Sequence, residues 1–143
     1  MSINSPAVHF IDANLIMYAM GGPHALRDPC KKIIEKIRDG KIFVATNTEV
    51  LQEILPRYFS ISRMALGEMA YRSLVQICLT VFLVTLQDTA KALELFKTDR
   101  GISSRDAIHA ATMLNNGLKK ILSTDSHFDR IPEIKRIDPT KFR

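Results

Sequence analysis

The sequence has few of the residues that cross-link small proteins. Its 143 residues include two cysteines, Cys30 and Cys78, and no tryptophan. The cysteines stand far apart, without a CxxC pair or a histidine-rich segment, which argues against a disulfide framework and against a structural zinc site. A chain of this length can bury a core without such cross-links. This cysteine usage favours the reducing cytoplasm, and we expect that location.

Long uninterrupted hydrophobic runs are also missing. The most apolar stretch, residues 74–86, contains Gln76 and falls short of the roughly 20 residues that a membrane-spanning helix needs. The first apolar segment has no basic start and is interrupted by His9, Asp12 and Asn14, unlike a signal peptide. We therefore expect neither secretion nor a membrane partner.

Acidic residues are the minority charge. The chain has 15 Asp and Glu against 20 Lys and Arg, which gives a formal net charge of +5. A basic surplus favours an acidic partner such as nucleic acid, although many basic proteins bind none. The 46% hydrophobic and 24% charged residues are typical of a globular protein. Since no linker, repeat or low-complexity tract divides the chain, we expect a single domain over residues 1–143.

Strand and helix patterns alternate along the chain. Short apolar runs predict strands at residues 7–11, 42–45, 81–84 and 121–123, with a short last strand near 135–137. Helical spacing predicts helices at residues 28–38, from about 50 to Pro56, 60–78, from Asp88 or Thr89 to 96, and from Ser103 or Ser104 to 116. Pro56 is expected to kink or end its helix. The alternation predicts an α/β domain with a mainly parallel sheet and helices on both faces.

Four carboxylates stand near a predicted strand end or helix start: Asp12, Glu53, Asp106 and Asp125. Each has an ordinary structural interpretation. Asp12 can cap a helix, Asp106 can form a capping box with Ser103, and Asp125 can begin a turn. Ligands of such folds bind beyond the carboxyl ends of parallel strands, where these acids would converge. We therefore expect them to lie close together.

Such a cluster needs a cation. Uncompensated carboxylates repel one another and raise one another's pKa. Oxygen ligands without cysteine or a paired-histidine motif suit Mg²⁺ or Mn²⁺ rather than zinc. With the basic surplus, the pattern favours a metal-dependent phosphodiesterase, in which the metal lowers the pKa of a bound water and shields charge on the phosphate.

Four sequence blocks carry a family resemblance. They read FIDANLI at 10–16, VLQEI at 50–54, SRDAIHAAT at 104–112 and LSTDSHFDRIP at 122–132, followed by IDP at 137–139. In this order and spacing the chain resembles the PIN-domain nucleases, most closely the VapC-type toxins of VapBC toxin–antitoxin pairs. The resemblance covers the chain from Phe10 to Pro139.

The resemblance implies a PIN-like three-layer α/β/α sandwich and a Mg²⁺- or Mn²⁺-dependent endoribonuclease that cuts RNA. It also implies an antitoxin that covers the acidic groove, and a homodimer. The family's site maps onto metal and catalytic positions at Asp12, Glu53, Asp106 and Asp125, an outer or second-metal position at Asp129, and hydrogen-bonding positions at Asn14 and Thr124.

The second block departs from the family pattern. Family members usually carry Ser or Thr six residues before the glutamate, where this chain has Asn47 between two threonines. Glu49 shares a helix face with Glu53 and is an alternative ligand. The Leu-Gln-Glu context favours Glu53, and the helix dipole already accounts for Glu49.

Other interpretations stay open beside the nuclease. His109, one turn after Asp106, has the spacing of a general base, but we expect it to pack or hydrogen-bond beside the site. Arg57 and Arg63 are candidates for contacting an RNA backbone. The alternative function is a module of the same fold that binds RNA or protein without cutting, or an RNA-processing role without an antitoxin. A phosphatase is disfavoured, because Asn14 replaces the second aspartate of an Asp-x-Asp motif.

Overall fold

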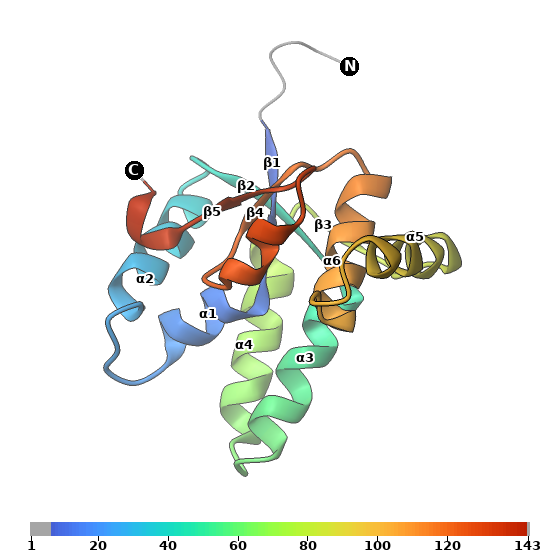
Figure 1. Ribbon diagram of the computed structural model, residues 1–143. Coiled ribbons are helices and arrows are strands. Elements are labelled where there is room, and N and C mark those ends of the chain that lie inside the picture. Colours follow the sequence, from blue (N-terminus) through green and yellow to red (C-terminus); the bar gives the residue numbers. More distant parts are fainter. Residues whose placement is uncertain (1–6, 143) are drawn as a thin grey trace.

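The computed structural model describes residues 7–142 and is built around a five-stranded sheet (Figure 1). The strands are β1 (Val8–Ile11), β2 (Phe43–Asn47), β3 (Thr80–Phe82), β4 (Lys120–Leu122) and β5 (Lys135–Ile137). Their order is β3-β2-β1-β4-β5, and every neighbouring pair is parallel. The predicted parallel sheet is therefore confirmed.

Helices make the connections between the strands. They are α1 (Ala13–Met20), α2 (Arg27–Arg38), α3 (Thr48–Phe59), α4 (Met64–Ile77), α5 (Leu86–Thr98) and α6 (Ser104–Asn115), with short 3-10 helices η1 (Ser126–Arg130) and η2 (Pro139–Lys141). The chain moves one way across the sheet from β1 to β3 and returns the other way to β4. Right-handed connections then place α1 to α4 on one face and the adjacent α5 and α6 on the other (Figure 1). This is the expected α/β/α sandwich.

Buried side chains explain why these segments form regular elements. The apolar stripe of α2, which includes Ile33, Ile34 and Ile37, packs into the core, and the central strands bury Phe10 and Ile121 completely. Burying each such side chain contributes about 1.5–3 kcal/mol. Within residues 7–142, no helix combines the length and apolarity needed to span a membrane.

Three helix boundaries differ from the sequence expectations, those of α3, α5 and α4. α3 does not end at Pro56 but continues past it. Because proline has no N–H, Pro56 cannot donate to the carbonyl of Gln52, four residues earlier in the helix. Both residues are exposed, so water can donate to that carbonyl instead. α5 begins after Thr85 rather than at Asp88 or Thr89, because Thr85 and Asp88 exchange side-chain-to-backbone hydrogen bonds in a capping box.

A tight turn separates α3 from α4, and α4 begins at Met64 rather than at Ser60. Ser62 adopts a φ of 56°, a left-handed conformation that a right-handed helix excludes. The two helices then run side by side and extend beyond the sheet (Figure 1). Their contact is close, since a Cβ on Gly67 would lie 2.8 Å from the Cβ of Tyr58.

Candidate metal centre

The carboxyl ends of β1 and β4 meet where the chain reverses its direction across the sheet. This reversal is the place at which α/β sheets bind ligands. Asp12 follows β1 directly, and Asp125 follows β4 after two further residues. A cavity of about 420 Å³ opens beside them. Its lining brings together the predicted residues Asp12, Asn14, Glu53, Asp106, Thr124 and Asp125.

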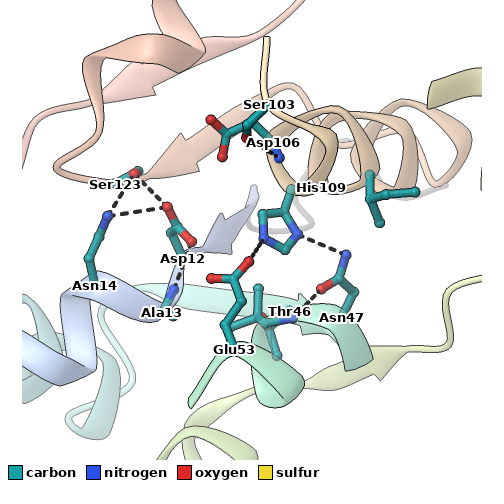
Figure 2. A network of polar contacts seen from close by, with 12 residues as sticks. Asp12, Ala13, Asn14, Thr46, Asn47, Glu53, Ser103, Asp106, His109 and Ser123 are labelled. Atoms are coloured by element: carbon teal, nitrogen blue, oxygen red, sulfur yellow. Dashed lines mark hydrogen bonds and ion pairs between the residues drawn. The ribbon is translucent and has the colours of Figure 1, made fainter. Parts of the chain in front are cut away.

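Asp12 is a helix cap and a cavity residue at once. One carboxylate oxygen accepts the backbone N–H of Ala13 at 2.8 Å, so the capping interpretation is correct. The other oxygen accepts hydrogen bonds from the Ser123 hydroxyl at 2.7 Å and from the Asn14 amide at 3.2 Å (Figure 2). Burial raises the pKa of Asp12 in spite of these donors. Burial therefore makes the ionised form of Asp12 less favourable than it is in water.

Ser123 links three parts of the site. Besides donating to Asp12, its oxygen accepts the backbone N–H of Asp125 at 3.0 Å. The Asn14 amide oxygen accepts the backbone N–H of Thr124 at 3.3 Å, which ties α1 to the end of β4. Sequence reasoning placed Asn14 and Thr124 at orienting positions but gave Ser123 no role. The sequence signal that could have indicated a role for Ser123 is its position, as a small polar residue between the apolar strand β4 and Asp125.

Glu53 projects from the second turn of α3 toward His109 of α6. Its Oε1 lies 2.7 Å from Nε2 of His109, and Nδ1 of His109 lies 3.2 Å from the amide nitrogen of Asn47 (Figure 2). Glu49, the alternative ligand, lies one turn earlier and is not among the residues that line the cavity. Asn47, which breaks the family's Ser or Thr pattern, caps α3 and reaches across to α6.

The protonation of His109 is set by opposing effects. Complete burial disfavours the imidazolium, but the hydrogen bond with Glu53 and the negative charges of Asp12, Glu53 and Asp106 outweigh burial and raise the pKa of His109. The expectation that His109 hydrogen-bonds beside the site agrees with this position. The amide nitrogen of Asn47 faces the other ring nitrogen, Nδ1.

Asp106 and Asp125 form the more open side of the cavity. Asp106 lies in the first turn of α6, where its backbone N–H donates to the Ser103 hydroxyl at 3.1 Å. Burial, followed by the negative charge of Asp125, raises the pKa of Asp106. Asp125 begins η1 by accepting the backbone N–H of His127 at 2.9 Å. Ser103 thus caps α6, but within the described residues it forms only this half of the expected capping box with Asp106, while Asp125 begins its turn as expected. Both carboxylates also line the cavity.

Asp129 and Arg63 lie outside this cavity lining. Both oxygens of Asp129 accept hydrogen bonds from Arg136, at 3.1 and 3.2 Å. Arg136 also donates to the backbone carbonyl of Ser123 at 3.2 Å, so Asp129 contacts the site through this arginine. Of the two arginines considered for RNA contact, Arg57 lines the cavity, as does Arg105. Arg63 lies in the turn between α3 and α4, directly before α4.

The donor set fits a hard divalent cation. The potential ligand atoms form two groups, and within each group they all lie within 4.8 Å of one another: Asp12 with Glu53 and His109, and Asp106 with Asp125 and His127. Among residues 7–142, the cavity carboxylates form ion pairs with histidine alone. Four acids therefore share a cavity with little compensating charge in contact, and their oxygens are the ligands that Mg²⁺ and Mn²⁺ prefer.

The comparison with protein families agrees with this geometry. The model of the PIN domain matches residues 9–134. The chain belongs to the PIN domain family. Ribonuclease VapC13 of Mycobacterium tuberculosis is 30% identical over 127 residues, which cover 89% of this PIN domain and 97% of that protein. The four acids fall inside the matched region.

Solved structures share the fold of this PIN domain. The crystal structure of VapC20 from Mycobacterium tuberculosis, described as a sarcin–ricin loop cleaving toxin, superposes with a TM-score of 0.70 and 19% identity, covering 87% of this chain and 94% of that one. VapBC2 from Rickettsia felis, solved with a promoter DNA fragment, gives a TM-score of 0.70 at 15% identity and covers 91% and 97% of the two chains. At these identities the likeness supports the fold.

Proposed function

We propose that this PIN domain is a metal-dependent endoribonuclease that hydrolyses RNA phosphodiester bonds, and that it is the toxin of a toxin–antitoxin pair. The observation that carries the proposal is the meeting of Asp12, Glu53, Asp106 and Asp125, from four separate elements, in one cavity. VapC13 is named a ribonuclease and VapC20 is described as a cleaving toxin, and both relatives support the same activity.

The four acids would hold Mg²⁺ or Mn²⁺. Such an ion lowers the pKa of a bound water and shields charge on the scissile phosphate. Ser123 and Asn14 would hold Asp12 in one orientation by their hydrogen bonds to its carboxylate. Arg57 and Arg105 would attract the RNA backbone, because they place positive charge at the cavity.

Asp129 takes the outer position in this proposal. Both of its carboxylate oxygens pair with Arg136, and Arg136 also donates to the backbone carbonyl of Ser123. Asp129 would therefore act on the site by holding Arg136, and Thr124 by holding Asn14.

The family also supports an antitoxin that covers the acidic cavity, and a homodimer in the cytoplasm. The α3–α4 hairpin presents large apolar side chains, with Phe59 48% and Met64 64% exposed, as expected of a protein-binding surface. Light scattering of the purified chain measures the homodimer directly. A monomer at the highest soluble concentration would contradict it.

Metal titration and RNA cleavage test the nuclease proposal together. We expect Mn²⁺ to bind the wild-type chain in calorimetry, and a labelled single-stranded RNA to be cleaved with Mg²⁺ or Mn²⁺ but not with EDTA. Asp12→Asn should abolish cleavage while circular dichroism stays native. Full cleavage by this variant would remove the site assignment. RNA binding without metal binding would favour the non-catalytic module instead.

A further inference from the structure

Two completely buried polar residues, His109 and Asn47, lie behind Glu53 without lining the cavity. Burying polar groups is costly unless they are hydrogen-bonded, so their arrangement needs a reason. The inference below rests on the proposed function, because it takes Glu53 as a ligand of the divalent cation. It concerns what holds Glu53 in place.

The amide of Asn47 has one orientation. Its Oδ1 accepts the backbone N–H of Val50 at 2.9 Å, because Asn47 caps α3. Its Nδ2 lies 3.0 Å from the hydroxyl oxygen of Thr112. That hydroxyl gives its single proton to the carbonyl of Ile108, at 3.0 Å, and so accepts from Asn47. Two independent contacts therefore place the amide N–H groups of Asn47 toward α6.

The orientation of Asn47 determines which nitrogen of His109 carries the proton. The second N–H of the amide is directed at Nδ1 of His109, 3.2 Å away, so Nδ1 accepts. The ring proton then lies on Nε2, which donates to Oε1 of Glu53 at 2.7 Å. The ring is also packed against Phe10 and Phe128, with centroid distances of 5.6 and 6.5 Å.

We propose that His109 is a positioning residue of the reaction: through Nε2–H it fixes Oε1 of Glu53, and Asn47 fixes His109. In this arrangement His109 is neither a metal ligand nor a general base, since Nε2 holds a proton toward Glu53 and the lone pair of Nδ1 is occupied. Oε2 of Glu53 remains available to a cation. The N-cap of α3 thereby sets the orientation of a carboxylate that projects from the second turn of the same helix.

Nitrogen NMR on the full chain with ¹⁵N-labelled histidine tests the orientation without any assay of activity. At alkaline pH, where the ring is neutral, we expect His109 to show a protonated Nε2 and an unprotonated Nδ1, in metal-free protein and with Mg²⁺. Asn47→Ser keeps a capping hydroxyl for α3 but cannot reach His109, and should change the Nδ1 signal while the melting temperature shows the chain folded. An unprotonated Nε2 in the wild-type chain would overturn the proposal.

Two substitutions of His109 separate positioning from packing. His109→Phe keeps an aromatic ring but has no donor, and His109→Gln offers an amide N–H near the position of Nε2. We expect His109→Phe to lower Mn²⁺ affinity and kcat by about 10- to 100-fold, with KM for RNA little changed, and His109→Gln to recover most of the loss. A folded His109→Gln variant as impaired as His109→Phe would overturn the proposal.

A double-mutant cycle distinguishes positioning from direct metal ligation. If His109 acts only through Glu53, His109→Phe should change Mn²⁺ affinity no further once Glu53→Ala is present. A further loss in that background would make His109 a ligand and overturn the proposal. If the wild-type chain neither binds Mn²⁺ nor cleaves RNA, the nuclease proposal fails, while the NMR result still decides whether Nε2 donates to Glu53.

Discussion

The two sides of the cavity are built differently. On the side of Asp12 and Glu53, the Glu53 and His109 side chains are 16% and 1% exposed. Hydrogen bonds from buried side chains hold both carboxylates, since His109 contacts Glu53 and Ser123 donates to Asp12. On the side of Asp106 and Asp125, the side chains of Asp125 and its neighbour His127 are 33% and 66% exposed. The buried side thus has fixed geometry, whereas the open side has carboxylates within reach of solvent and substrate.

Besides the hydrogen bond from the Asp125 N–H to Ser123, a surface strap supports the open side. Arg130, at the end of η1, donates to both oxygens of Asp99 at 2.7 and 2.8 Å, and Asp99 also accepts the backbone N–H of Gly101 at 2.8 Å. This strap joins the segment before α6 to η1, which begins beside Asp125. Exposed ion pairs are weak. We infer that the buried side sets the geometry and that the open side adapts to what binds.

The largest expected effect is at the open side, where charge can be removed without a change of shape. Asp125→Asn keeps an oxygen that can accept the His127 N–H and cap η1, but it removes one negative charge from the cavity. We expect cleavage to fall by about 10³-fold, because metal ions supply several kcal/mol of catalysis, with an unchanged melting temperature. RNA cleavage and thermal melting measure the two effects. A large fall in melting temperature would show that this side, too, is structural.

A matched pair of serines compares the two sides directly. Ser123 donates to the carboxylate of Asp12 at 2.7 Å, whereas the main hydrogen bond of the Ser103 side chain is the one it accepts from the backbone N–H of Asp106 at 3.1 Å. Ser123→Ala should reduce kcat by about 10- to 100-fold, because Asp12 loses an orienting donor. Ser103→Ala should cost about 1 kcal/mol of unfolding free energy as a lost cap, with activity nearly unchanged. Equal losses of activity in the two variants would contradict the contrast between the sides.

The limits of sequence reasoning follow the same division. The helix-start acids and the parallel sheet were predictable, because capping residues and apolar runs are local patterns, and both α6 and η1 begin as expected. The partners of the buried side were not, since Asn47, His109 and Ser123 come from segments far apart in the chain. Only the packing of α3 against α6 brings Asn47 to His109. The turn at Ser62 escaped prediction because serine rarely adopts a positive φ.

The smallest expected effect is on stability, and it depends on pH. Because burial and Asp125 raise the pKa of Asp106, the folded chain binds this proton more tightly than the unfolded chain does. Without metal, stability is therefore lost as the pH rises through the raised pKa, and Asp106→Asn avoids that loss. We expect the variant to melt at a higher temperature than the wild-type chain at pH 7 in metal-free buffer.

Two conditions should remove the advantage of Asp106→Asn. Below about pH 3 the wild-type carboxyl group is mostly protonated in both the folded and the unfolded chain, so the melting temperatures of the two chains should converge. With Mn²⁺ the order should reverse, because a ligand that binds only the folded state stabilises the wild-type chain more than a chain lacking one of its acids. An advantage of the variant that persisted at low pH would mean that repacking of α6, and not charge, stabilises it. The open side would then be held by the same kind of fixed packing as the buried side.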